Sequence, residues 1–213
     1  MPGAQGLICG GYPATDACYW LPSLKKIRMK KKRYLAASLV FNSRLLVTGG
    51  YDGNGYLKST EWVSATLPHL EDTELPITLY GHSMELINIE GQPTAIVIGG
   101  RSSSGPTSRT FLGNLNGAQI QWTDGPTLKT GRRYHASALL QLQDTTYIVV
   151  SGGRGGGRSV ELMEVTSSQS EWKWTAGKLF FCAHFFAMHL NQSNMFLDLH
   201  AMLCHHHHLY QLC

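Results

Sequence analysis

The chain has 213 residues, of which 43% are hydrophobic and 15% charged, and its formal net charge is +4. This composition, with 23 glycines, favours a turn-rich β protein over a helical bundle or a disordered chain. No run of about 18 apolar residues is present, so we expect no membrane-spanning segment and no membrane partner. The first residues also lack the pattern of a secretory signal peptide.

The basic residues are concentrated in one segment. Seven of the 18 lie in "KKIRMKKKR", residues 25–33, which leaves 11 basic against 14 acidic residues in the rest of the chain. Such a run can be a nuclear-localisation or nucleic-acid patch, or a solvated loop. We expect the loop, and therefore no nucleic-acid partner.

Four apolar, β-branched runs each end on a pair of glycines. They read "GLICGG", "LLVTGG", "AIVIGG" and "YIVVSGG", and the glycine pairs recur at intervals of 39, 50 and 53 residues. The pairs are Gly10 and Gly11, Gly49 and Gly50, Gly99 and Gly100, and Gly152 and Gly153. Self-similarity at this period is typical of repeat proteins built from small β-sheets.

The residues around the glycine pairs also repeat. A first strand and a turn precede three of the pairs, beginning at Arg33, Tyr80 and Arg132, with His82 and His135 at one shared position that Ala36 fills in the first copy. A polar loop and a third strand follow, in "LKSTEWVS", "TFLGNL" and "SVELMEV". Two copies then reach a tryptophan, Trp122 and Trp174. The layout predicts four antiparallel strands per unit.

These motifs resemble the kelch repeat, in which an apolar strand ends on Gly-Gly and a tryptophan follows. The resemblance covers three units in residues 34–178 and part of another in residues 6–20. It implies an all-β, kelch-like β-propeller with three full blades, a partial blade and four-stranded antiparallel sheets. We expect the propeller in residues 1–190 and a divergent, His-rich tail, disordered or not native blade sequence, in 191–213. In residues 65–79 no tryptophan stands where the first full unit should have its fourth strand.

The glycine pairs and the two tryptophans are interpreted as structural. Glycine permits positive φ and the close approach of another backbone where a strand must turn at once. Met29 precedes Arg33 by four positions, as Leu128 precedes Arg132, so the basic run aligns with a connection between units. This alignment also predicts a solvated loop there.

Cysteines and the C-terminal residues leave several questions open. Cys9 and Cys18 flank a predicted hairpin and can be bridged, as in a secreted protein, or free, as in a cytosolic one, so the compartment is undetermined. Asn191 is the one N-glycosylation acceptor. "CAHFFAMHL", residues 182–190, can supply a further first strand beside "GLICGG" and close a small ring. A fragment of a larger ring is the interpretation we favour.

No motif in the chain indicates a catalytic or metal site. His205–His208 are consecutive and cannot all converge on one ion, and "DGNG" from Asp52 lacks the closing glutamate of a calcium loop. Neither a nucleophile elbow nor a phosphate-binding glycine loop is present. We therefore expect no enzyme activity and no cofactor. The alternative that the resemblance implies is a galactose-oxidase-like copper enzyme, whose ligands cannot be placed on this sequence.

The loops that follow the glycine pairs are the predicted binding surface. Loops on a rigid scaffold are where binding residues gather. Arginine, serine and tyrosine in these loops suit an acidic or phosphorylated peptide, and solvated turns are the alternative. The resemblance implies a protein-binding module, such as a ubiquitin-ligase substrate adaptor, an actin-binding module or a secreted kelch-type protein. The predicted partner-binding residues are Tyr12, Tyr51, Asp52, Asn54, Arg101, Ser102, Ser103, Arg154 and Arg158.

Overall fold

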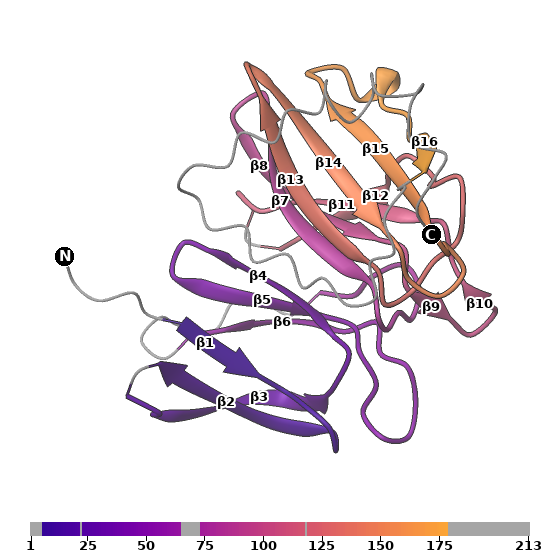
Figure 1. Cartoon of the computed structure of the whole chain (residues 1–213). Helices are drawn as coiled ribbons and strands as arrows, with labels where there is room; N and C mark the ends of the chain where they lie inside the picture. Colours follow the sequence, from indigo (N-terminus) through magenta and orange to yellow (C-terminus); the bar gives the residue numbers. More distant parts are fainter. Residues whose placement is uncertain (1–5, 22, 65–72, 118, 179–213) are drawn as a thin grey trace, which may run out of the picture.

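A computed structural model describes residues 6–21, 23–64, 73–117 and 119–178. These residues form an all-β protein whose antiparallel strands make four small sheets and one short hairpin (Figure 1). Within the described ranges, helical structure is limited to a 3₁₀ turn at Gln169–Glu171. The prediction of an all-β chain with antiparallel sheets is therefore confirmed.

We number the four sheets in chain order. Sheet 1 comprises β1 (Gly6–Cys9), β2 (Thr15–Leu21) and β3 (Lys26–Arg33). Sheet 2 comprises β4 (Ala37–Phe41), β5 (Arg44–Thr48) and β6 (Thr60–Val63). Sheet 3 comprises β7 (Ser83–Ile89), β8 (Gln92–Ile98), β11 (Thr110–Asn114) and β12 (Trp122–Asp124). Sheet 4 comprises β13 (Ala136–Leu142), β14 (Thr145–Ser151), β15 (Ser159–Val165) and β16 (Thr175–Lys178). The hairpin pairs β9 (Arg101–Ser102) with β10 (Gly105–Pro106).

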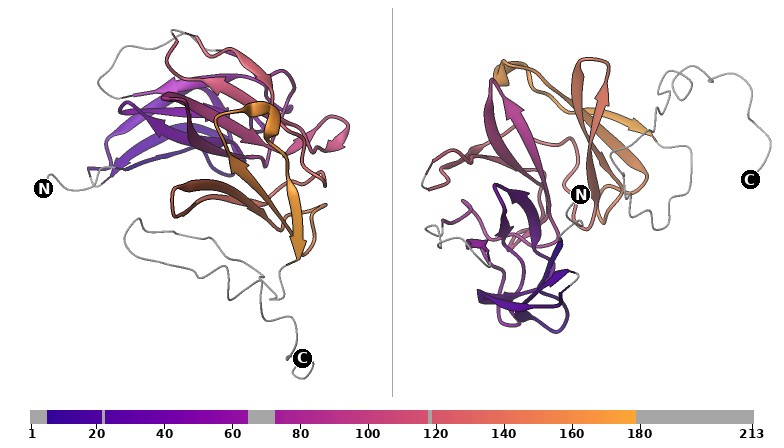
Figure 2. Two further views of the ribbon diagram at one scale, coloured as in Figure 1. Left: turned by 90° about the horizontal axis from the view of Figure 1, so that it is seen from above. Right: turned by 90° about the vertical axis from the view of Figure 1, so that its left-hand side faces the viewer.

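The sheets pack face to face in chain order along a curved row. One apolar core lies between sheets 1 and 2, a second between sheets 2 and 3, and a third between sheets 3 and 4. The first strands β4, β7 and β13 contact one another in turn, so they gather along the inner side of the row. Figure 2 shows sheets 1 and 4 at its two ends. Among the described residues, no strand pairing joins these ends into a ring.

Strand β8 shows why the strands before the glycine pairs are continuously apolar. Ala95 and Val97 face the core shared with sheet 2, whereas Ile96 and Ile98 face the core shared with sheet 4, and all four side chains are fully buried. Side chains alternate between the two faces of a strand. A sheet packed on both faces therefore needs apolar residues at successive positions of its central strand.

The glycine pairs repeat one hydrogen-bond pattern, complete in sheets 1, 2 and 3 and present at the first glycine in sheet 4. The first glycine donates its N–H to a carbonyl oxygen in the following strand or directly before it, with N···O distances of 3.0 Å at Gly10, 3.1 Å at Gly49, 3.0 Å at Gly99 and 3.3 Å at Gly152. The second glycine donates to the residue that leads into the next sheet: Gly11 to Arg33, Gly50 to Leu79 and Gly100 to Arg132. The pairs thus end one strand and attach the connection to the next sheet.

Steric crowding explains why these positions hold glycine. Gly49 and Gly99 have φ of 58° and 57°, in the left-handed region. A Cβ on Gly99 would lie 2.8 Å from the carbonyl oxygen of Arg132 and 3.0 Å from the ring of His135. The same clash with the next connection recurs at Gly10, where the oxygen of Arg33 would lie 2.6 Å away.

One detail of the sequence-based prediction is wrong, and a second is met only in part by the described residues. The basic run is not a loop: Lys26–Arg33 is β3, which pairs with β2 and buries Met29 and Arg33 while its lysines remain exposed. Lysines on an edge strand discourage pairing with other chains, and the run therefore has a reason to be basic without a nucleic-acid partner. Sheet 2 also has three strands rather than four in the described residues. There a single bridge between Ser59 and Glu74 stands where a fourth strand was expected.

The tryptophans and the cysteines connect neighbouring elements. The indole N–H of Trp122 donates to Thr73 Oγ1 at 3.3 Å, and that of Trp174 donates to the carbonyl oxygen of Pro126 at 2.9 Å. Each thus contacts a segment that precedes its own sheet or leads into it. Cys9 and Cys18 lie opposite each other on β1 and β2 and form a disulfide. The boundary predicted at residues 190 and 191, and the tail beyond it, lie outside the described residues.

Candidate binding surface

The residues that directly follow the glycine pairs occupy equivalent places. Tyr51 forms an antiparallel bridge with Tyr34, Arg101 with Tyr80, and Arg154 with Arg133. In each case one partner follows a glycine pair, and the other lies just before the first strand of the same sheet. These bridges therefore bring the side chains of both positions to the same end of the sheets.

Six tyrosines form a continuous row of ring contacts across this end. The rings of Tyr12 and Tyr34, of Tyr34 and Tyr51, and of Tyr51 and Tyr56 have centroids 5.5, 5.5 and 5.6 Å apart. The row continues from Tyr56 to Tyr80 at 4.6 Å and from Tyr80 to Tyr134 at 5.9 Å. We call Tyr12, Tyr34, Tyr51, Tyr56, Tyr80 and Tyr134 the tyrosine row. It runs from sheet 1 to sheet 4, and it is most exposed at its ends, with Tyr12 86% and Tyr134 47% exposed.

A chain of backbone hydrogen bonds fixes the row between sheets. The N–H of Gly81 donates to the oxygen of Leu35 at 2.8 Å, and the N–H of Tyr134 donates to the oxygen of Gly81 at 2.7 Å. All three residues have φ between 56° and 62°, so they make the same left-handed turn in three successive sheets. A Cβ on Gly81 would lie 2.6 Å from the ring of Tyr134. Glycine at this position therefore lets the Tyr134 ring approach Tyr80.

Arginines border the part of the row that lies on sheets 3 and 4. The guanidinium of Arg133 lies 5.6 Å from the ring centroid of Tyr80 and 5.0 Å from that of Tyr134, and it donates a hydrogen bond to the Tyr80 hydroxyl. Arg101 and Arg154 are the bridge partners of Tyr80 and Arg133. Among the described residues, none of these three arginines forms an ion pair with a carboxylate. This half of the row is therefore cationic.

The predicted partner-binding residues divide between this surface and local loop structure. Tyr12, Tyr51, Arg101 and Arg154 lie on the row or next to it, and Arg158 is exposed in the loop before β15. Asp52 instead accepts the N–H groups of Asn54 and Gly55, both at 2.8 Å, and these bonds hold the pKa of the Asp52 carboxyl below its usual value. Asn54 is exposed on that turn.

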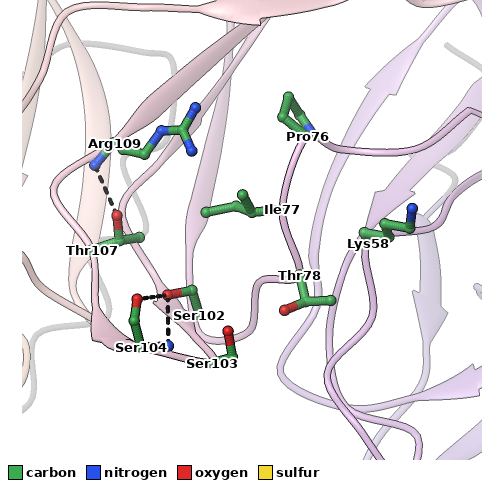
Figure 3. A pocket seen from close by; sticks show the side chains of 9 residues that line it. All are labelled: Lys58, Pro76, Ile77, Thr78, Ser102, Ser103, Ser104, Thr107 and Arg109. Carbon is green, nitrogen blue, oxygen red and sulfur yellow. Dashed lines mark hydrogen bonds between the residues drawn. The ribbon is translucent and has the colours of Figure 1, made fainter.

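The remaining two predicted residues lie in the hairpin after Gly100. Ser102 is buried, and its hydroxyl bonds to the Ser104 hydroxyl at 2.8 Å. Ser103 is exposed and lines a separate hollow of about 390 Å³ between sheet 2 and the loops of sheet 3 (Figure 3). Lys58 and Arg109 stand on opposite sides of this hollow and pair with Glu74 and Asp124, so the hollow offers no unpaired cation among its lining residues.

Arg133 and four tyrosines of the row, Tyr34, Tyr56, Tyr80 and Tyr134, were not predicted from the sequence. Their ring contacts join residues of different units, so no local motif marks them. A signal was nevertheless available. Tyr34, Tyr80 and Arg133 each follow the residue that leads into a new unit, and reading that column of the repeat would have found them.

The structure also bears on metal and membrane sites. In the described ranges, no three side chains of histidine, cysteine, aspartate or glutamate gather as a metal site would require. His205–His208 lie outside those ranges. The described residues contain no helix with the length and hydrophobicity needed to cross a membrane.

Comparisons with known proteins add no family to these observations. No protein-family model matches the chain, and no curated protein matches it either. The repeat assignment therefore rests on the internal repetition of the sequence and of the hydrogen bonds at the glycine pairs.

Proposed function

We propose that this chain is a non-enzymatic protein-binding module of the kelch-repeat type, whose sheets are blades of a propeller. The fold part of the proposal is supported by the repetition of one layout in four consecutive sheets. Each sheet has the same glycine hydrogen bond, and the first strands of sheets 2, 3 and 4 gather on one side. A propeller places neighbouring blades in this relation.

The proposed ligand is an acidic, extended segment of a partner protein. The observation that carries this proposal is the tyrosine row together with Arg101, Arg133 and Arg154, which have no carboxylate partner among the described residues. A guanidinium group can bind a carboxylate through two parallel hydrogen bonds. Tyrosine provides a large contact area at low entropic cost. An acidic peptide laid along the row would pair its carboxylates with the arginines and pack its remaining groups on the rings.

Replacement of Arg101 and Arg154 by alanine tests the proposal. The probe is a fluorescent peptide of alternating glutamate and serine, and a lysine–serine peptide is its charge-reversed counterpart. Wild-type protein should bind the acidic peptide and not the basic one. Binding should weaken as salt shortens the screening length from about 10 Å at 0.1 M to about 3 Å at 1 M. The R101A/R154A variant should lose about 2–5 kcal/mol of affinity if both pairs are desolvated.

A matched control is Arg109→Ala. Arg109 directly precedes β11 of sheet 3. It pairs with Asp124 at 2.6 Å and borders the hollow instead of the tyrosine row. This variant should bind the acidic peptide as the wild type does, and the thermal transitions of both variants should stay near that of the wild type. Undiminished peptide binding by R101A/R154A would place the site elsewhere on the molecule.

A further inference from the structure

Strand β3 of sheet 1 carries more charge than the other outer strands. Six of its eight residues, KIRMKKKR, are basic. The outer strands β12 and β16, which end sheets 3 and 4, have one charged residue each, in WTD and TAGK. A charged side chain on an edge strand discourages pairing with another chain. Since a single one is present at β12 and at β16, protection of the edge leaves most of the charge of β3 unexplained.

An irregular register exposes successive lysines on this strand. Thr15 pairs with Arg33, and Ala17 pairs with Arg28, so the register advances by two residues on β2 and by five on β3. Such a bulge breaks the alternation of side chains between the two faces of a strand. The three lysines at residues 30–32 lie in the bulge, and all three are exposed.

The carboxylate that holds the backbone of the bulge does not neutralise it. Glu61 accepts the N–H groups of Lys30 and Lys31 at 2.6 and 3.2 Å, and it also pairs with Arg33. Glu61 is 3% exposed and Arg33 is 1% exposed. The charge of Glu61 is therefore balanced inside the protein by Arg33.

Four lysines in β3 or directly before it keep an uncompensated charge. The two arginines of the strand are paired, Arg28 with Asp16 at 2.8 Å and Arg33 with Glu61. In the described part of the chain no carboxylate forms an ion pair with the four lysines, and all four are exposed. Like charges on one strand repel each other, and a bound polyanion relieves that repulsion. We call these residues the lysine edge: Lys25, Lys26, Lys31 and Lys32.

The shape of the lysine edge fits a single, linear polyanion. A strand of eight residues is about 26 Å long, and the edge follows it one strand wide. A linear chain can keep successive anionic groups along such a line, whereas the phosphates of a duplex wind around a cylinder. Tyr19 lies beside the edge, with its ring centroid 5.9 Å from the Lys26 ammonium, and is 40% exposed. Its ring offers an apolar face for a sugar.

The disulfide of the same sheet indicates which linear polyanion is available. Cys9 and Cys18 join β1 to β2. Disulfides persist in oxidising compartments such as the cell exterior. Sulfated polysaccharides are abundant linear polyanions there, whereas nucleic acids lie in reducing compartments.

We propose that the lysine edge of β3 binds a sulfated polysaccharide. Its sulfate groups lie along Lys25, Lys26, Lys31 and Lys32, and a sugar ring packs against Tyr19. This site is on the outer strand of sheet 1 and is separate from the arginines of the tyrosine row. The proposal does not depend on the acidic peptide.

Calorimetric titration with a heparin octasaccharide tests the site. The variant K26S/K31S/K32S removes three exposed charges of the lysine edge and leaves the buried and paired residues of β3 in place. At 0.1 M salt its affinity should be at least about tenfold lower than that of the wild type, because fewer counterions are released on binding. For the same reason its affinity should fall less steeply as the salt concentration rises.

Two control variants locate the site. K58S/K129S/K173S also removes three exposed lysines and has the same net charge as the first variant, but none of its positions lies in sheet 1. It should bind the octasaccharide as the wild type does, and so should R101A/R154A. Equal weakening by both triple variants would reduce the effect to net charge and overturn the proposal. Loss of binding in R101A/R154A would place the polysaccharide on the tyrosine row, which would also overturn it.

Two further probes test the chemistry of the ligand. A desulfated octasaccharide and a DNA duplex with the same number of charges as the heparin probe should both bind the wild type more weakly than heparin does. Equal or tighter binding of either probe would overturn the proposal, as would a wild type that does not bind heparin at 0.1 M salt. The thermal transitions of all variants should match that of the wild type, since the replaced lysines are exposed.

Discussion

Two buried ion pairs attach connections to the sheets that follow them. Arg33 pairs with Glu61, and Arg132 pairs with Glu161 at 2.7 Å, and all four side chains are at most 4% exposed. Glu161 also accepts the backbone N–H of Lys129 at 2.6 Å. At the connection between sheets 2 and 3, Leu79 and Phe111 replace the arginine and the glutamate. The repeat therefore tolerates an ionic or an apolar pair, but both members change together.

Removal of one member of such a pair should be far more destabilising than replacement of both. Glu161→Ala leaves the Arg132 charge buried without its partner and should lower the free energy of unfolding by about 3–5 kcal/mol. The double variant R132L/E161F copies Leu79 and Phe111 and should recover most of that loss. Urea unfolding of the three proteins gives the comparison. A double variant as unstable as E161A would contradict the interpretation of the pairs as interchangeable.

Two buried histidines should make the fold sensitive to acid. Burial is the main cause that lowers the pKa of His82 to about 3 and that of His135 to about 4, with smaller effects of nearby positive charge. In the unfolded chain both would titrate near pH 6.5, so the unfolded state binds more protons below that pH. Acidification from about pH 7 to 5 should therefore cost about 2 kcal/mol of stability per histidine.

A double variant isolates this contribution. Alanine occupies the equivalent position in sheet 2 at Ala36, so H82A/H135A uses a residue that the repeat accepts. The variant loses the bonds from the ring nitrogens to Thr48 and Ser83 and should be less stable at pH 7. Its stability should then fall less steeply than that of the wild type between pH 7 and 5, as measured by urea unfolding. Parallel pH profiles would show that the histidines are not buried in their neutral form.

At the scale of elements, the strands that sequence reasoning placed best are those with local signals. The glycine pairs mark the ends of β1, β5, β8 and β14, because neighbouring residues determine both the apolar strand and the turn that ends it. Strand β3 was missed because five of its eight residues are exposed, three of them successive lysines, and only Met29, Arg33 and the half-buried Ile27 face inward. Its pairing with β2 is interrupted by a bulge near Thr15, which disturbs the alternation that reveals a strand.

The proposed binding surface could be predicted only in part for a related reason. Positions after the glycine pairs were identified because they repeat, and Tyr12, Tyr51, Arg101 and Arg154 do gather at one end of the sheets. The side chains of Asp52 and Ser102 form hydrogen bonds within their own loops. These bonds depend on the geometry of each turn, which the composition of the loop does not reveal. The contribution of Arg133 depends on its stacking against rings from sheets 3 and 4, and such contacts arise only when the sheets pack.

At the scale of the whole molecule, four small sheets produce a surface that none of them has alone. The tyrosine row crosses from sheet 1 to sheet 4, and its character changes from aromatic at Tyr12 to cationic near Arg133 and Arg154. The left-handed turns at Leu35, Gly81 and Tyr134 keep the sheets in register at this end. The proposed extended ligand would therefore contact several sheets at once, with its acidic part on sheets 3 and 4.

Mapping of the acidic glutamate–serine peptide on the isotopically labelled chain by NMR tests the central claim most directly. Saturable shifts of backbone amides are expected together at the residues after the glycine pairs, namely Tyr12, Tyr51, Arg101 and Arg154. The largest shifts should occur at Arg101 and Arg154, where the row is cationic. Shifts confined to the hollow near Lys58, Ile77 and Thr107, with no change along the tyrosine row, would contradict the account.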